Sequence, residues 1–340
     1  MRKKQLTLFS LIFSFILIAT LFSGCTSKSS QTTVKVRLNE VTRSIFYAPM
    51  YAAISEGFFK EEGIEIDLTT GEGADKTMQQ VLSGSVDIGF SGPEQVIYIY
   101  NQKREDYPVV FGQLTQKDGS FIVSRQDEKN FNWETLRGKK LLGGRPGGVP
   151  QMALEYVLKN KGINPNKDLD MITNIAFAAV TGAFKGGTAQ YAALFEPNAS
   201  LLRKDNTGYV VASVGAEAGT IPYTCFYATK SYIEKNPQVI EKFTRAIYKG
   251  QLWVQKNTEA DVAKSIKSFF PGTDEEIIVS VIKNYKAIEA YAPNLVLKES
   301  DMTRLMDIIQ SYKADLITER PPYSKIVNNS FAEKAIKDVK

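Results

Sequence analysis

The sequence predicts an α/β fold of two related parts, followed by a helical C-terminal part. From residue 34 onwards, short apolar or alternating runs predict strands, and most are followed by apolar residues at helical spacing. This alternation starts again near Trp133, and after Tyr227 the segments are mostly helical. With 340 residues, of which 43% are hydrophobic, the chain is long enough to form about two domains.

The first part is expected to form a parallel sheet with helices on both faces. Helical spacing predicts a helix over residues 47–59, ending before Gly63, and a shorter helix around residues 78–82. Ser91 is expected to cap the next helix, because its hydroxyl can accept a bond from a free N–H group of the first turn. The predicted strands are residues 34–38, 64–68, 86–90, 109–111 and 121–123.

The second part is expected to pair further strands with a helix at residues 152–158, which follows a glycine-rich run. The C-terminal helices are expected to begin at Asn236, at a capping box formed by Thr273 and Glu276, and after Ser300. The predicted strands of the second part are residues 139–142, 192–195 and 209–212.

Residues 1–25 are typical of a secretory signal peptide, with a basic start, an apolar run and small residues before a cysteine. The end of this segment, LFSGC, resembles a bacterial lipobox, although Phe22 departs from the usual leucine. The resemblance implies that Cys25 is lipidated and anchors the protein to the membrane. The alternative is a signal-anchor helix that stays in the membrane. Residues 26–33 are polar and are expected to form a flexible tether.

Composition excludes several classes of function. The chain has no histidine, so Ser-His-Asp catalysis, Cys-His catalysis and His-bearing zinc sites are excluded. Cys225 lies in an apolar strand-like run, which predicts a buried, inert thiol. The formal net charge is +5, and three of the positive charges lie in residues 1–25, so a nucleic-acid partner is not expected. No metal, no cofactor and no enzymatic activity are expected.

Ligands of open α/β sheets bind beyond the carboxyl ends of the strands, close to the N-termini of helices. The glycine-rich run before residue 152 could offer N–H groups to an anionic ligand group, or it could be a turn that merely needs glycine. Arg145 in this run is either a ligand-binding cation or a solvated loop residue. The rule selects these candidate ligand-binding residues: Ser44, Phe46, Tyr47, Glu72, Gly73, Ser91, Glu94, Arg145, Gly147, Gly148, Glu196, Asn198, Tyr223 and Thr224.

Four motifs resemble the solute-binding proteins of the nitrate, sulfonate, taurine and thiamine-precursor importers. Residues 47–64, YAPMYAAISEGFFKEEGI, match every position of the family's opening helix motif. The runs GSVDIG at residues 84–89, WETLRGK at residues 133–139 and YAALFEP at residues 191–197 follow in the family's order. The resemblance covers about residues 34–325 of the sequence.

This resemblance implies a type II periplasmic-binding-protein fold, with two α/β lobes joined by two hinge strands. Lobe one would comprise residues 34–124 plus 224–335, and lobe two residues 125–223. The hinges would be residues 121–124 and 224–227. The protein would be a monomeric receptor that captures a small solute between the lobes and delivers it to an ABC permease. A lipoprotein that senses its ligand for a membrane signalling partner remains an alternative.

The residue types at the candidate site leave two ligand classes open. Carboxylates accept bonds from amino or ring N–H groups and repel anions, and aromatic rings can stack on a flat ligand. These residues favour a nitrogen heterocycle, such as a pyrimidine thiamine precursor or a flavin-like vitamin, over a nitrate, sulfonate or taurine-like anion. Otherwise the glutamates face solvent or cap helices. The carboxylates are Glu72, Glu94 and Glu196, and the rings are Phe46, Tyr47, Phe195 and Tyr223.

Overall fold

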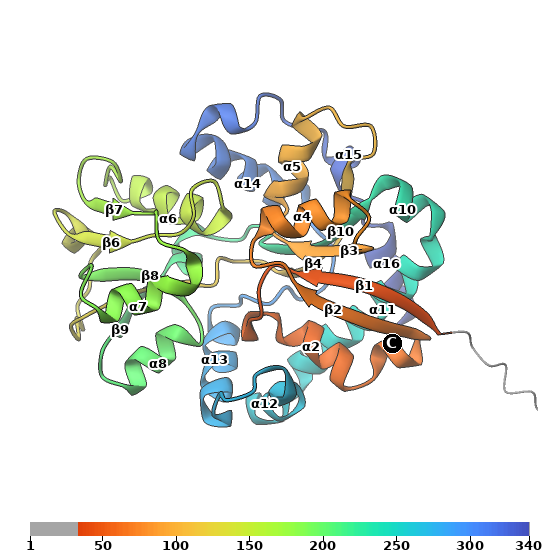
Figure 1. Cartoon of the computed structure of the whole chain (residues 1–340), viewed down its shortest axis with the longest axis horizontal. Helices are drawn as coiled ribbons and strands as arrows, with labels where there is room; N and C mark the ends of the chain where they lie inside the picture. Colours follow the sequence, from red (N-terminus) through yellow and green to blue (C-terminus); the bar gives the residue numbers. More distant parts are fainter. Residues whose placement is uncertain (1–32, 340) are drawn as a thin grey trace, which may run out of the picture. The chain divides into compact units, whose positions relative to one another are not determined.

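The computed structural model describes residues 33–339, and Figure 1 shows their arrangement. The predicted signal peptide, including Cys25, lies outside the described residues, as does all of the tether except Thr33. One compact unit begins at Val34 and contains two five-stranded sheets. Across residues 33–339, none of the helices has the length and hydropathy needed to span a membrane.

Sheet A has the strand order β2-β1-β3-β10-β4. β1 pairs in parallel with β2 and β3, but β10 is antiparallel to both β3 and β4. The sheet is therefore mixed rather than purely parallel, because β10 returns from a distant part of the chain. Its strands are β1 (Val34–Glu40), β2 (Ile64–Thr70), β3 (Ile88–Ser91), β4 (Pro108–Thr115) and β10 (Thr224–Thr229).

Helices cover both faces of sheet A, with α4 and α5 on one side and α2 and α11 on the other (Figure 1). The expected helix over residues 47–59 is two helices, because Gly57 adopts a positive φ of 79° between them. Ser91 is the last residue of β3, and Pro93 occupies the cap position instead. The helical elements of this region are η2 (Ile45–Tyr47), α2 (Ala48–Ser55), α3 (Phe58–Glu61), α4 (Ala74–Leu82) and α5 (Glu94–Asn101).

Sheet B has the strand order β7-β6-β8-β5-β9, and β5 is antiparallel to both of its neighbours. Successive residues of β5 point to opposite faces of sheet B and pack in different hydrophobic cores. Ile122 packs with α6 and α9, whereas Val123 packs with α7 and α8. Its strands are β5 (Ser120–Ser124), β6 (Lys140–Leu142), β7 (Asp170–Ile172), β8 (Tyr191–Phe195) and β9 (Tyr209–Ser213), and its helices are η3 (Trp133–Leu136), α6 (Val149–Asn160), η4 (Phe177–Ala179), α7 (Val180–Lys185), α8 (Asn198–Lys204) and α9 (Val214–Ala218).

The chain passes between the sheets twice, at residues 116–119 and again at residues 219–223. We call residues 33–115 with 224–339 lobe A, and residues 120–218 lobe B. Both segments expected to be hinges are strands inside a sheet: residues 121–124 belong to β5, and residues 224–227 belong to β10. The crossings lie directly beside them.

After β10 the chain is helical, as expected, although two starts differ from the prediction. Asp274 rather than Thr273 occupies the cap of α13, without a side-chain bond, and α14 begins at Glu299. α14 packs on α6 and α13 on α8, so both touch lobe B. The helices are α10 (Lys230–Lys235), α11 (Pro237–Lys256), α12 (Glu259–Ile266), η5 (Lys267–Phe269), α13 (Glu275–Ala287), α14 (Glu299–Tyr312), η6 (Ala314–Leu316), α15 (Tyr323–Ile326) and α16 (Ser330–Asp338).

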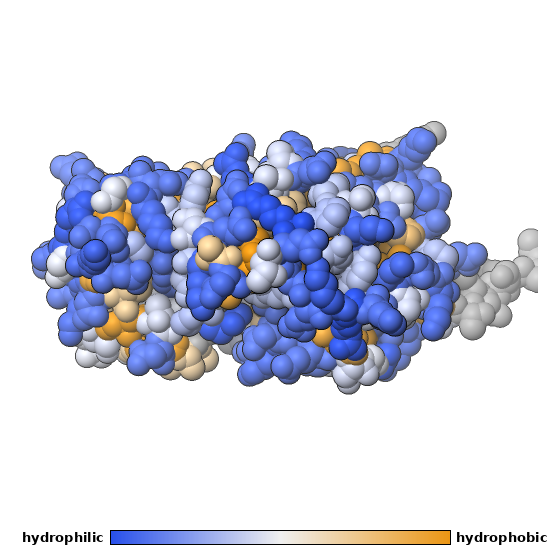
Figure 2. All heavy atoms as spheres, turned by 90° about the horizontal axis from the view of Figure 1, so that it is seen from above, coloured by the Kyte–Doolittle hydropathy of each residue, from blue (hydrophilic) through white to orange (hydrophobic). Residues whose placement is uncertain are grey.

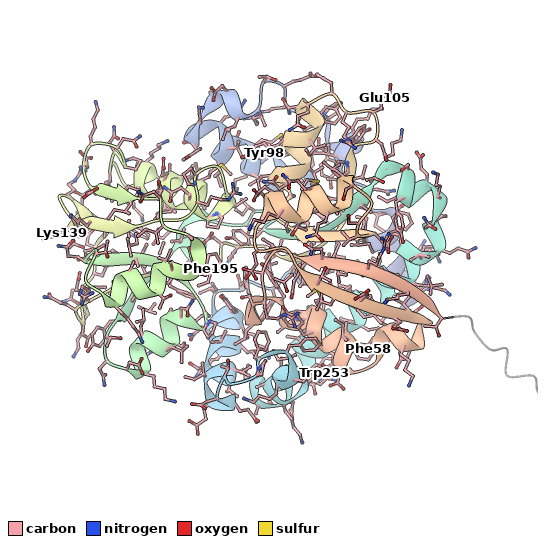
Figure 3. All side chains as sticks on the ribbon, viewed as in Figure 1. Phe58, Tyr98, Glu105, Lys139, Phe195 and Trp253 are labelled. Carbon is pink, nitrogen blue, oxygen red and sulfur yellow. The ribbon has the colours of Figure 1, made fainter. Side chains whose placement is uncertain are left out.

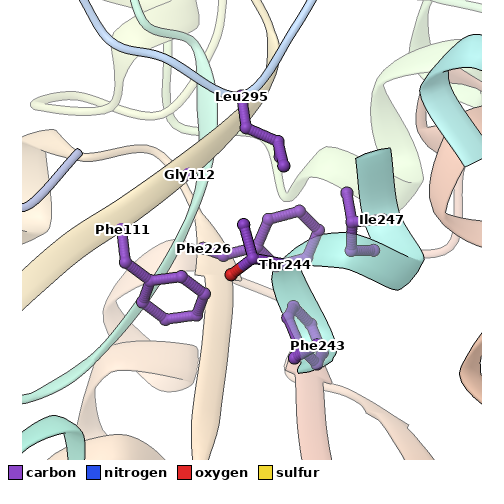
Figure 4. Close-up of a pocket in the computed structure, with 7 residues that line it drawn as sticks. All are labelled: Phe111, Gly112, Phe226, Phe243, Thr244, Ile247 and Leu295. Carbon is purple, nitrogen blue, oxygen red and sulfur yellow. The ribbon is translucent and has the colours of Figure 1, made fainter. Parts of the chain in front are cut away.

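Part of the core of lobe A lies between sheet A and α11. Figure 4 shows Phe111 and Phe226 of the sheet close to Phe243 of the helix. Phe243 makes edge-to-face contacts with both rings, at centroid distances of 6.0 and 5.2 Å. At the surface, apolar residues are scattered among hydrophilic ones on the face in Figure 2. Among the described residues, only Val34 and Val210 are large hydrophobic residues with high exposure.

The packing of α11 on α2 depends on a close approach at Gly250, because a Cβ there would lie 2.3 Å from the carbonyl oxygen of Pro49. We expect Gly250→Ala to lower the free energy of unfolding by about 1–3 kcal/mol. Gly182→Ala is the matched control, because α7 leaves this position open and alanine should stabilise the helix by about 0.5–1 kcal/mol. Chemical denaturation of both variants would measure the difference, and equal midpoints would contradict this packing.

Candidate functional site

The carboxyl ends of β1, β3 and β4 meet at one edge of sheet A, together with the start of β10. Tyr47 follows β1, Glu94 follows β3, Asp118 follows β4, and Tyr223 precedes β10. Tyr223 lies beside Asp118, with which it shares a hydrogen bond, and the charge of Glu94 acts on both tyrosines. All four are at least nine-tenths buried. We call Phe46, Tyr47, Ser91, Glu94, Asp118, Tyr223 and Thr224 the interlobe cluster.

Aromatic rings form one wall of the interlobe cluster. Phe46 contacts Tyr223 edge to face, with ring centroids 5.6 Å apart, and lies 6.3 Å from Phe195 of lobe B. Figure 3 places Phe195 between the two sheets. Phe46 is held by the turn η2, in which the Ser44 hydroxyl accepts a bond from the Phe46 N–H. Ser44 therefore supports this wall through the backbone.

Glu94 is the first residue of α5 and only 1% of its surface is exposed. Its carboxylate folds back over Gly92, where a Cβ would lie 2.0 Å from Oε2. Oε1 accepts a bond from Gln95 at 3.2 Å, whereas Oε2 has no partner. Burial raises the pKa of the Glu94 carboxyl to about 7, although Arg145 opposes the rise. Nearby Ser91 is bonded to the Tyr227 hydroxyl at 2.6 Å.

Asp118 is a buried acid that the sequence prediction missed. Its Oδ1 accepts bonds from the N–H and hydroxyl groups of Ser120. The Tyr223 hydroxyl lies beside this carboxylate and interacts with it as a hydrogen-bond donor. Burial raises the pKa of the Asp118 carboxyl to about 6. The sequence predicted that this strand ends at residue 111, whereas β4 extends to Thr115. Had the longer strand been predicted, the rule that ligands bind beyond the carboxyl ends of strands would have selected Asp118.

Thr224 completes the cluster at the start of β10. Its N–H donates to the Thr115 hydroxyl at 3.0 Å, and its side chain lies beside the Tyr47 hydroxyl. Next in the strand, Cys225 is free and buried, and burial raises the pKa of its thiol well above the usual value. This agrees with the inert thiol predicted from the sequence.

The glycine-rich segment of lobe B offers fewer free N–H groups than the sequence suggested. The Gly148 N–H donates to the Arg145 carbonyl at 3.1 Å, and the Gly144 N–H donates to Gln151. The Gly147 carbonyl accepts a bond from Tyr98 of lobe A at 3.1 Å. The Arg145 side chain is half exposed and lies 3.8 Å from Asp75. The segment thus connects the lobes, and part of its donor capacity is used internally.

Glu196 is buried, but both of its carboxylate oxygens have protein partners. Oε2 accepts from the Ser200 N–H, and Oε1 accepts from the Ser200 hydroxyl and from Asn284 of lobe A, each at 2.8 Å. Glu196 thus caps α8 and bonds across the lobes. Asn198 is the first residue of α8 and is half-buried. On the other side, Glu72 is exposed in the loop after β2, and Gly73 is the cap residue of α4.

Two mixed sheets joined by two chain crossings, with polar residues gathered at the strand ends between them, define a type II periplasmic-binding-protein fold. The family model described as "NMT1/THI5 like" matches residues 45–260, and the chain belongs to this family. The chain is 45% identical over 317 residues to "Putative binding protein YtlA" of Bacillus subtilis strain 168, covering 93% of this chain and 94% of YtlA.

Two further similarities are more distant. The chain is 26% identical to the 4-amino-5-hydroxymethyl-2-methylpyrimidine phosphate synthase of Aspergillus parasiticus, over 72% of this chain and 71% of the synthase. The alkanesulfonate-binding protein SsuA of Xanthomonas axonopodis pv. citri, solved with bound MOPS, has the same fold. Its TM-score is 0.71 at 14% identity, over 87% of this chain and 99% of SsuA.

The hydrogen bonds of Glu196 predict that a substitution at this position lowers the stability of the protein. In Glu196→Gln, an amide nitrogen replaces one acceptor oxygen and faces a donor, so we expect the free energy of unfolding to fall by about 1–3 kcal/mol. Glu72→Gln changes an exposed side chain and should unfold like the wild type. Urea denaturation would compare them, and an unaffected Glu196→Gln protein would count against these bonds.

The buried Glu94 predicts a pH-dependent stability. Its pKa of about 7 in the folded protein exceeds the unfolded value of 4.5, so stability contributed by the protonated form is present at low pH and is lost as the pH rises through 7. At pH 8, Glu94→Gln should therefore be more stable than the wild type by about 3 kcal/mol, since the two pKa values differ by about 2.5 units and one unit corresponds to about 1.4 kcal/mol.

Below about pH 4 this difference should vanish, because the wild-type carboxyl is then mostly protonated in both states. Denaturant titrations of both proteins at several pH values would measure the effect. A difference that stays constant with pH would show that Glu94 does not titrate in this range.

Proposed function

We propose that this protein is the extracytoplasmic solute receptor of an ABC importer. It would bind a small organic solute between lobe A and lobe B and present it to a permease. The observation that carries the proposal is the interlobe cluster, which gathers buried polar side chains, among them an unpartnered oxygen of Glu94, at the strand ends where this fold binds ligands. Family membership and the similarity to YtlA support a binding role.

The proposal includes a closure of the lobes around the solute. Tyr98 bonds to Gly147 and Asn284 bonds to Glu196, so contacts between the lobes lie on two sides of the molecule. A solute that makes additional bonds in the closed form shifts the population towards that form. We further propose that lipid on Cys25 holds this receptor, as a monomer, at the outer side of the cell membrane.

The ligand class that the interlobe cluster supports is a nitrogen heterocycle rather than an anion. Glu94 presents an unpartnered oxygen, which can accept a bond from an N–H donor, and the Asp118 carboxylate lies beside the Tyr223 hydroxyl. Phe46 and Tyr47 could pack against a flat ring. An anion such as the sulfonates bound by SsuA would approach both carboxylates, and it would have to be compensated by the half-exposed Arg145.

Catalysis is the second function to consider, because one relative is a pyrimidine phosphate synthase. The sequence has no histidine, and the only cysteine within the described residues is the buried Cys225. No activated nucleophile therefore lies in the interlobe cluster as described here. The proposed receptor releases its solute unchanged.

Cross-linking in intact cells, followed by purification of the full-length protein from membranes, tests the transport role. We expect an ABC permease among the linked proteins, because a receptor must dock on its transporter to deliver the solute. Recovery of a kinase or chemoreceptor without a permease would indicate sensing instead. Conversion of a candidate solute by substoichiometric protein would indicate an enzyme and would overturn the proposal.

A further inference from the structure

We propose that the glycine-rich segment of lobe B, residues 143–148, forms a closure latch with the hydroxyl groups of Tyr98 and Tyr312 of lobe A. The two tyrosines are positioning residues, because they act on solute binding by holding the lobes together. This inference rests on the proposed receptor function and names the contacts that control closure. The latch consists of protein groups, so it acts whether or not a solute is bound.

The partners of the latch come from strand ends of both sheets. The glycine-rich segment follows β6 of sheet B and leads into α6, whereas Tyr98 lies in α5, which follows β3 of sheet A. In open α/β sheets, ligands bind beyond the carboxyl ends of the strands. A bond between these two strand ends therefore spans the space in which the proposed receptor binds its solute, and it forms when that space closes.

Both tyrosines hold one residue of the segment, Gly147. The Tyr98 hydroxyl donates to the Gly147 carbonyl at 3.1 Å, and the Gly147 N–H acts as a donor on the Tyr312 hydroxyl. Gly147 has a φ of 75°, although a Cβ there would meet no other part of the protein within 4 Å. Glycine is therefore required for the backbone conformation that presents these groups, and not for lack of space.

Tyr98 and Tyr312 reach Gly147 from separate helices. Tyr312 is the last residue of α14, and the two tyrosines interact electrostatically. Both are also held to α6, because the Tyr98 hydroxyl lies 3.6 Å from the sulfur of Met152 and Lys159 donates to the carbonyl of Ser311. Burial raises the pKa of both tyrosines, so their hydroxyl groups stay protonated at neutral pH.

The contacts of Glu196 between the lobes have a different position. Tyr285 accepts a bond from the Glu196 N–H at 3.2 Å and donates to the Gly119 carbonyl at 3.3 Å. Gly119 belongs to the first chain crossing, so these bonds lie beside the hinge, where a rotation of the lobes displaces atoms least. The bonds at Gly147 involve no residue of either crossing, and they are the bonds that opening would break.

Distance measurements between two spin labels in the full-length protein, without added solute, test the inference. Lys76→Cys in lobe A and Asn174→Cys in lobe B place the labels at exposed positions that follow the edge strands β2 and β7. Cys225 is buried, and the labelled parent protein reports any signal from Cys25. We expect a population at short distance, the closed form, and its absence would overturn the inference.

Removal of either hydroxyl group should open the lobes. Tyr98→Phe and Tyr312→Phe should each raise the ratio of open to closed molecules by about three- to tenfold, because each deletes a hydrogen bond that the closed form makes. Tyr232→Phe is the matched control and should keep the wild-type ratio, because Asp87 and Arg37 of lobe A act on its hydroxyl. An unchanged ratio in both latch variants would overturn the inference.

Two glycines give a second matched pair. Gly147 and Gly162, which follows α6, have φ values of 75° and 77°, and a Cβ at either would meet no other part of the protein within 4 Å. Gly147→Ala and Gly162→Ala should therefore lower the unfolding midpoint to a similar extent. Only Gly147→Ala should raise the ratio of open to closed molecules, by about threefold or more, and equal ratios in the two variants would contradict the latch.

The outcome is separable from the test of the receptor role. A protein that cross-links to a permease, but whose label distances do not respond to these substitutions, refutes only the latch. A protein whose latch variants open, but which links to no permease, refutes only the transport role.

Discussion

The antiparallel return of β10 into sheet A is the constraint on which the site depends. β10 lies between β3 and β4, so its first residues meet the last residues of both neighbours. This pairing places Tyr223 and Thr224 beside Glu94, which follows one neighbour, and Asp118, which follows the other. Without it, the two chain crossings would not lie at the carboxyl edge of the sheet, and groups more than a hundred residues apart in sequence would not be neighbours.

Burial sets the protonation and the hydrogen-bonding demands of the acids in the interlobe cluster. The same desolvation raises the pKa of Glu94 and of Asp118 towards neutrality and makes the unpartnered oxygen of Glu94 costly. Glu40 and Glu196 are equally buried but are satisfied by neighbouring side chains. Glu94 thus differs from these two acids in its hydrogen-bond partners, because all three have the same charge and similar exposure.

The comparison with relatives separates the fold from its specificity. SsuA shares the fold with this chain at 14% identity, which leaves ample room for different groups at the strand ends. In this chain the strand ends hold the buried acids Glu94 and Asp118, whereas Arg145 is half exposed and lies near Asp75.

The sequence by itself determined the order of most strands and helices and the family, because periodicity and local motifs act over short distances, but it missed β7, α7 and α9. It also indicated that Glu72 and Glu196 could face solvent or cap a helix, as their positions now show. Only the tertiary structure decided that Asp118 lies beside Tyr223, and that Ser91 ends a strand rather than capping a helix. Those outcomes follow from pairing between distant strands and from burial, neither of which is encoded in a local pattern.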